Sequence, residues 1–213
     1  MLAAFRQTAQ LLPIFRSSGT KMRRFHDAFG STESIEIAPL IDSTTDLVRK
    51  TAFFSAAEKA SVRSHLDRYA DQLTVRTLPT VQVHDDWILR NIMVTADGTD
   101  YVVDCDSMRA RTDLRWLDLA YFLLNTDSQL KWHPLVTAEM LAELSREFWH
   151  GYAGENLPDS LTQEQVIGIL YILRLKCLLG GTTRLPYFDR PPYFEILGGP
   201  VGRRALRSLK DGS

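Results

Sequence analysis

The most constraining feature of this chain is a stretch in which ionisable side chains interrupt an apolar run. Residues 81–94 read VQVHDDWILRNIMV. The valines, the isoleucines and Met93 predict a segment that belongs in a core, yet His84, Asp85 and Asp86 lie among them. An ionised carboxylate is costly to bury unless it is paired or hydrogen-bonded. A fold that accepts these acids must hold them by specific contacts, which is typical of a chemical site.

Composition narrows the classes of protein that fit. With 213 residues, of which 45% are hydrophobic, the chain can form one substantial core, and we expect residues 1–213 to be a single domain. The formal net charge of -1 disfavours a nucleic-acid-binding protein and a polybasic membrane module. Cys105 and Cys177 form no CxxC motif, so neither a disulfide framework nor a zinc site is indicated. A reducing compartment is the simplest inference.

The N-terminal residues, MLAAFRQTAQLLPIF, predict an amphipathic helix rather than a targeting segment, because polar residues interrupt the apolar ones. The chain contains no window of about 18 apolar residues, the length that a membrane-spanning helix needs. We therefore expect a soluble, cytoplasmic protein with no membrane partner.

Helical patterns dominate on both sides of residues 81–94. We expect helices over residues 2–15, 21–29, 55–73, 114–126, 137–153 and 162–181, with a connector at 31–43. Ser55 and Glu58 predict a capping box, and Thr137 and Thr162 are expected N-caps. Two glycines at 180–181 predict the end of the last helix.

A short hairpin is expected directly after the acidic stretch. Residues 92–94 and 101–103 are rich in strand-forming side chains, and Ala96-Asp97-Gly98 supplies a turn between them. The predicted fold class is therefore mainly α with a small β-hairpin, an α+β arrangement.

The hairpin would bring three polar side chains together. Asp86 and Asn91 precede it and Asp104 follows it, so the two ends of the hairpin place them near one cavity. Two carboxylates and an amide oxygen are hard ligands that suit Mg²⁺ rather than zinc or copper. We call residues 84–91 the acidic loop.

The segment HDDWILRN, followed by VVDCDSMRARTDLRWLDLAYFL, resembles the catalytic loop and metal-binding segment of aminoglycoside phosphotransferases and choline kinases, which have a protein-kinase-like fold. The resemblance implies that Asp86 is the catalytic base and that Asn91 and Asp104 bind metal. Asp106 matches an acidic residue that often follows, a weaker candidate for a metal ligand.

Two further residues take supporting roles by the same resemblance. His84 matches the motif histidine that braces the loop, and Asp118 matches a structural aspartate at the start of the next helix. The implied reaction is transfer of the γ-phosphoryl group of ATP or GTP, with Mg²⁺, to a hydroxyl group of a small molecule. An amino sugar, such as an aminoglycoside, or a choline-like alcohol would be the substrate.

The chain departs from the family pattern at two points. Asp85 stands where the family has glycine, which puts a second negative charge beside the proposed base. The chain also lacks a G-x-G-x-x-G turn and a strand with a phosphate-binding lysine, and Lys21, Lys50 and Lys59 lie in other contexts.

The expected architecture is therefore a kinase-like C-terminal lobe without its N-terminal nucleotide lobe. The catalytic loop and metal segment would span residues 81–122, and a helical substrate-side region residues 123–213. A separate chain or an upstream segment would supply the missing lobe. The alternative is a non-catalytic pseudokinase or truncated half-protein that acts as a binding module.

Other polar and aromatic residues are expected to have structural roles. His26, His65, His133 and His150 show no metal-ligand spacing, so packing or surface positions are expected for them. Four aromatic residues belong in a core or, alternatively, line a pocket for a cationic substrate: Trp116, Trp132, Trp149 and Tyr152.

Overall fold

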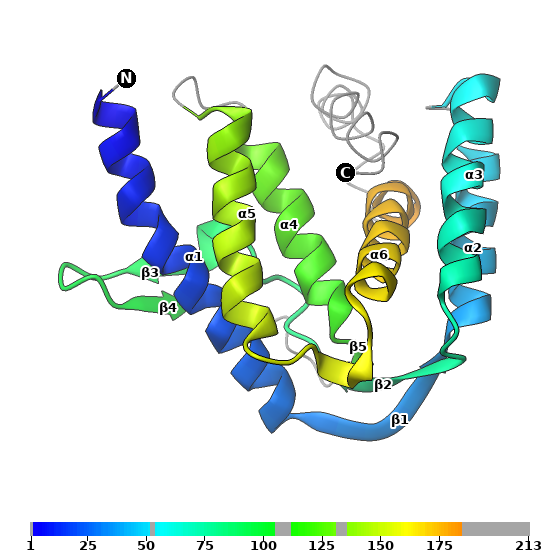
Figure 1. The fold of residues 1–213 in the computed structure, drawn as a ribbon, viewed down its shortest axis with the longest axis horizontal. Helices are drawn as coiled ribbons and strands as arrows, with labels where there is room; N and C mark the ends of the chain where they lie inside the picture. The colour runs from blue at the N-terminus through cyan, green and yellow to red at the C-terminus, as the bar shows by residue number, and fades with distance from the viewer. Residues whose placement is uncertain (1, 52–53, 105–111, 131–135, 185–213) are drawn as a thin grey trace. The chain divides into compact units, whose positions relative to one another are not determined.

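The structure, a computed structural model, describes residues 2–51, 54–104, 112–130 and 136–184. These residues are mainly helical and carry small antiparallel sheets (Figure 1), which confirms the predicted fold class. The helices are α1 (Leu2–Ala28), α2 (Ile37–Lys50), α3 (Ala56–Gln72), α4 (Trp116–Leu130), α5 (Ala138–Ala153) and α6 (Gln163–Arg184). The strands are β1 (Gly30–Glu36), β2 (Thr77–Gln82), β3 (Ile92–Val94), β4 (Asp100–Val102) and β5 (Thr112–Leu114). Within the described ranges, no helix is long and apolar enough to cross a bilayer.

The chain divides into two compact units, and the boundaries between them fall inside β1, inside β2 and after Ser160. The first unit takes its described residues from 2–33 and 79–160, and the second from 34–78 and 161–184. The division of residues 1–213 into a catalytic segment and a substrate-side region stays a prediction.

Two glycines let α1 and α5 pack closely in the first unit (Figure 1). A Cβ atom at Gly19 would lie 2.1 Å from the carbonyl oxygen of Phe148, and one at Gly151 would lie 2.0 Å from that of Arg16. Phe148 also stacks on Phe122 of α4, with ring centroids 4.2 Å apart. The backbones of α1 and α5 therefore touch, and aromatic rings fill the space toward α4.

The structure corrects the predicted helices near the N-terminus. Residues 2–15 and 21–29 were expected as separate helices, but α1 runs without a break through Pro13 to Ala28. A proline inside a helix removes one backbone hydrogen bond and disfavours the conformation. Contact with α5 along the following turns stabilises the continuous helix, because tertiary packing outweighs local propensity.

Residues 31–43 are not the expected connector, because they form β1 and the start of α2. The strand is mostly exposed, so it carries no alternating apolar pattern by which a sequence would reveal it. Pro39 lies in the first turn of α2, where the missing N–H would have had no helical partner.

The second unit packs α2, α3 and α6 together. The Ser55–Glu58 capping box of α3 is confirmed, with both reciprocal hydrogen bonds present. Thr162 caps α6 by accepting from the N–H of Gln165 at 3.3 Å. The predicted end of α6 at Gly180-Gly181 is wrong, because the helix continues to Arg184. Glycine lowers helix propensity by only about 1 kcal/mol and does not force a helix to end.

The close contact of α1 and α5 predicts a large difference between two glycine variants. We expect Gly19→Ala to lower the free energy of unfolding by about 1–3 kcal/mol, because the new methyl group meets backbone that cannot move aside. Gly30→Ala is the matched control, since no atom lies within 4 Å of its added Cβ. Urea denaturation of both variants measures the effect, and equal stabilities would contradict the close packing.

Candidate active site

Buried apolar side chains anchor the acidic loop just before its first residue and at its middle. Val83, Trp87 and Ile88 are each no more than 3% exposed. The indole N–H of Trp87 donates to the Ser18 hydroxyl on α1 at 3.1 Å. These contacts hold the loop against α1, so the polar residues next to the buried ones have defined positions.

Asp86 and Asn91 contact each other directly. The side-chain nitrogen of Asn91 donates to the backbone oxygen and to Oδ2 of Asp86, each at 2.9 Å. A short 3-10 turn, Leu89–Asn91, folds the chain back so that the amide reaches Asp86. Because the nitrogen faces Asp86, the oxygen of the same amide faces the other way. The proposed base and a proposed metal ligand are therefore held as a pair.

The hairpin connects Asn91 to the residue that precedes Asp104. In the β3–β4 ladder Ile92 pairs with Val102, and the N–H of Val103 donates to the carbonyl oxygen of Asn91 at 2.8 Å. Asp104 follows directly, exposed and in a left-handed conformation with φ 62°. The sheet register thus sets the spacing between the two residues.

The expectation that Met93 and Val94 belong in the core is wrong. They are 58% and 46% exposed. A two-stranded hairpin offers few neighbouring elements that could cover both of its faces.

His84 lies at the centre of this cluster of acids. The residue is 2% exposed, and its ring packs edge-on against Trp87 with centroids 5.4 Å apart. Burial lowers the pKa of His84 below its ordinary value, although the charges of Asp118, Asp86, Asp104 and Asp85 each oppose that shift. The imidazole is therefore within electrostatic reach of four carboxylates and is neutral at pH 7.

Asp118 holds the backbone of the acidic loop. Its Oδ2 accepts from the N–H of His84 at 2.7 Å, and its Oδ1 accepts from the N–H of Asp85 at 2.9 Å. Asp118 lies in the first turn of α4 and has no exposed surface. A negative side chain in the first turn is also favoured by the helix dipole. The carboxylate joins the start of α4 to the loop.

Sequence reasoning missed two contacts that α1 makes with this region. His26 Nε2 lies 3.1 Å from Oδ2 of Asp118, although no sequence spacing pointed to that pair. Lys21 forms an ion pair with Asp100 of the hairpin, Nζ to Oδ1 at 2.6 Å, and Ser17 donates to the same oxygen at 2.7 Å. Helix α1 therefore supports both the acidic loop and the hairpin.

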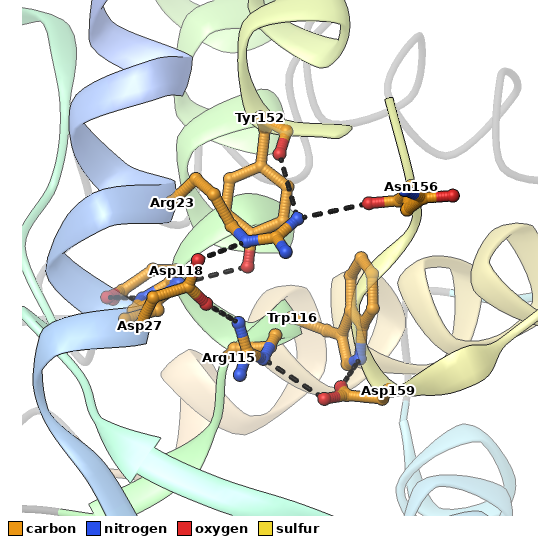
Figure 2. A network of polar contacts seen from close by, with 9 residues as sticks. Arg23, Asp27, Arg115, Trp116, Asp118, Tyr152, Asn156 and Asp159 are labelled. Carbon is orange, nitrogen blue, oxygen red and sulfur yellow. Dashed lines mark hydrogen bonds and ion pairs between the residues drawn. The ribbon is translucent and has the colours of Figure 1, made fainter. Parts of the chain in front are cut away.

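A second polar network supports the start of α4 (Figure 2). Asp27 of α1 pairs with Arg115 at 2.8 Å and with Arg23 at 2.7 Å. Burial alone would raise the pKa of Asp27, but its hydrogen bonds from the two guanidinium groups outweigh burial and lower it. Arg115 and the indole N–H of Trp116 also reach Asp159, at 3.3 and 3.0 Å. The residues that precede Asp118 are thereby fixed from two sides.

Residues 9–160 match the phosphotransferase enzyme family, more than half of the chain. The chain belongs to this family. The resemblance that the acidic loop and its hairpin indicated is thereby confirmed. No curated protein sequence matches the chain significantly.

Solved structures of glucosamine kinase share the fold of this phosphotransferase-family chain. One crystal form is 20% identical to this chain and has a TM-score of 0.63. The match covers 96% of this chain and 53% of the kinase chain. The kinase chain in a complex with glucosamine, ADP and inorganic phosphate is 19% identical to this chain and has a TM-score of 0.62. The match covers 96% of this chain and 52% of the kinase chain. The chain thus spans about half the length of these kinases.

Three of the candidate residues that the structure describes carry side-chain oxygen donors. Asp86, Asn91 and Asp104 supply carboxylate and amide oxygens, which fit Mg²⁺ better than a softer metal. Asp106 and Cys105 lie outside the described residues. Within the described ranges no three His, Cys, Asp or Glu side chains gather closely enough to hold a metal.

Asp85, where the family pattern has glycine, adopts a left-handed conformation with φ 63°. This region is open to glycine, whereas other residues pay roughly 1 kcal/mol to enter it. The bond from the Asp85 N–H to Asp118 holds the strained conformation in place. Asp85 therefore adopts a conformation that glycine would enter without this cost.

This strain predicts that Asp85→Gly raises the free energy of unfolding by roughly 1 kcal/mol relative to Asp85→Ala. Both variants remove the same charge, so the comparison isolates the backbone conformation. Urea denaturation of both proteins provides the measurement. An alanine variant as stable as the glycine variant would contradict the strained conformation.

Proposed function

We propose that this chain is the catalytic and substrate-side half of a cytoplasmic small-molecule kinase. It transfers the γ-phosphoryl group of ATP or GTP to a hydroxyl group of its substrate. The observation that carries this proposal is the double hydrogen bond from Asn91 to Asp86. It is supported by the bond from the N–H of Val103, the residue before Asp104, to the carbonyl oxygen of Asn91. Asp86, Asn91 and Asp104 are three polar positions that the phosphoryl-transfer chemistry of the family requires.

Asp86 is the group we assign to the reacting hydroxyl. Its carboxylate accepts a hydrogen bond from the hydroxyl, orients the oxygen and takes its proton as the new oxygen–phosphorus bond forms. The bond from the γ-phosphorus to the nucleoside diphosphate breaks in the same transfer. Asn91 holds Oδ2 of Asp86 in place, and Arg90 lies 3.8 Å from that oxygen.

Asn91 and Asp104, with Asp106 as a weaker candidate, are the residues that would hold Mg²⁺ on the nucleotide phosphates. When bound there, the cation supplies neutralisation of the negative phosphate oxygens. His84, neutral and buried against Trp87, braces the loop rather than binding metal.

An amino sugar is the substrate class that we favour. Support comes from the shared fold with glucosamine kinase, of which one structure is a complex with glucosamine, ADP and inorganic phosphate. A choline-like alcohol is the other class that the resemblance implies. Trp116 and Tyr152 give no support to an aromatic cage for either substrate, since both side chains are fully buried.

A second candidate function is a non-catalytic binding module. This candidate is favoured by the contacts of three lysines, none of which points to a phosphate ligand. Lys21 pairs with Asp100, Lys50 pairs with Asp46, and Lys59 donates to the carbonyl oxygen of Arg49. If the chain is catalytic instead, a separate chain or an upstream segment supplies the nucleotide-binding half.

A transfer assay tests the proposed reaction. We expect the chain, with Mg²⁺ and γ-labelled ATP or GTP, to label glucosamine, an aminoglycoside or choline, and EDTA to abolish the labelling. Asp86→Asn should lower kcat by about 10²–10⁴-fold because the proton acceptor is lost. Asp97→Asn, in the exposed hairpin turn, is the matched control and should keep full activity. Equal activity of the two variants would refute the role of Asp86.

Thermal unfolding with nucleotide separates the two candidate functions. A ligand that binds only the native state at a hundredfold excess over Kd stabilises it by about 2.7 kcal/mol. We expect Mg-ATP or Mg-GTP to raise the Tm of the wild-type chain but not that of Asp104→Ala. A magnesium-dependent rise without phosphoryl transfer would favour the binding module. No rise in either protein would exclude independent nucleotide binding.

A further inference from the structure

A fully buried imidazole on α1 contacts the carboxylate that holds the acidic loop. His26 has no exposed surface, and its Nε2 lies 3.1 Å from Oδ2 of Asp118. Its Nδ1 lies 3.0 Å from the hydroxyl oxygen of Tyr152 on α5. Asp118 and Tyr152 are among the side chains drawn in Figure 2. A polar chain thus runs from α5 through α1 to the start of α4.

We propose that His26 is a positioning residue for phosphoryl transfer, acting on Asp86 through Asp118 and the loop backbone. This inference rests on the proposed function. The contact sequence is Tyr152 to His26, His26 to Asp118, and Asp118 to the loop N–H groups.

The direction of each hydrogen bond follows from the chemistry of the groups. An ionised carboxylate only accepts, so the proton of the His26–Asp118 contact is carried by Nε2. When Nδ1 carries no proton it accepts, and the hydroxyl of Tyr152 donates to it. Burial raises the pKa of Tyr152 well above its ordinary value, so the phenol keeps the proton that it donates. In this series of hydrogen bonds each contact then has one donor and one acceptor, which fixes the orientation of the imidazole.

The Asp118 carboxylate needs this donor because it is completely buried. Its Oδ2 is shared by the Nε2–H of His26 and the backbone N–H of His84. Without His26, Oδ2 would keep only the N–H of His84 as a donor, in a site with no exposed surface. A buried charge that loses a hydrogen-bond donor is destabilised. The carboxylate would then hold the loop less firmly.

Asp86 is the residue that a looser loop would displace. It directly follows Asp85, whose N–H is bonded to Asp118 while its φ is strained at 63°. When the carboxylate shifts, the strained residue can relax toward a more favourable φ, which turns the chain at Asp86. A general base that moves by a fraction of an ångström loses alignment with the hydroxyl, while binding of nucleotide elsewhere changes less.

The test compares full-length variants by backbone amide hydrogen exchange and by kinetics. His26→Leu removes the donor at similar volume, His26→Gln keeps an N–H donor, and Tyr152→Phe removes only the hydroxyl. Thr44→Val is the matched control, because Thr44 is equally buried but bonds to Leu40 within α2. The amides of His84 and Asp85 report on the loop directly.

We expect His26→Leu to speed exchange at His84 and Asp85 by about tenfold beyond any change at the slowest core amides. Tyr152→Phe should have a smaller effect, His26→Gln should restore most of the protection, and Thr44→Val should leave these two amides unchanged. In the transfer assay, kcat should fall about tenfold in His26→Leu with KM for the nucleotide within about twofold.

Several outcomes would overturn the inference. Unchanged exchange at His84 and Asp85 in a folded His26→Leu protein would show that the imidazole only packs. Faster exchange with an unchanged kcat would remove the role in positioning Asp86, and a glutamine variant no better than leucine would exclude the hydrogen bond as the cause. If the wild-type chain transfers no phosphoryl group, the proposed function fails, but the exchange data still decide whether His26 holds the loop.

Discussion

The arrangement of this site depends on one buried carboxylate. Asp118 has no exposed surface and takes hydrogen bonds from the backbone of His84 and Asp85 and from the ring of His26. A buried charge is tolerated only when several donors surround it, and these donors come from α1 and from a loop far away in the sequence. The need to satisfy Asp118 therefore determines where α1, α4 and the acidic loop meet.

The helices around Asp118 are held in place by contacts that leave little freedom. Gly19 and Gly151 allow the backbones of α1 and α5 to touch, and Arg115, next to the start of α4, pairs with Asp27 of α1. Exposed ion pairs contribute little by themselves, but Arg115 is mostly buried and has two carboxylate partners. A rigid frame of this kind is what a site needs when catalysis depends mainly on positioning.

Much of the candidate site could be predicted because its residues are close in sequence. Asp86 and Asn91 are joined by a single short turn, and Asp104 follows through a hairpin whose turn residues are recognisable. Local patterns of this kind predict local geometry well. The left-handed conformation of Asp85 could not be predicted in the same way, because the carboxylate that accepts from its N–H belongs to Asp118, which is distant in the sequence.

By itself the sequence determined the helical class, the hairpin, the caps at Ser55 and Thr162, and the membership of the phosphotransferase family. Each of these depends on residues within a few positions of one another or on a motif of fixed spacing. Only the tertiary structure decided that α1 continues through Pro13, since packing against α5 outweighs the local cost of proline. It also decided the pairing of His26 with Asp118, because a hydrogen bond between residues 26 and 118 leaves no periodic pattern in the sequence.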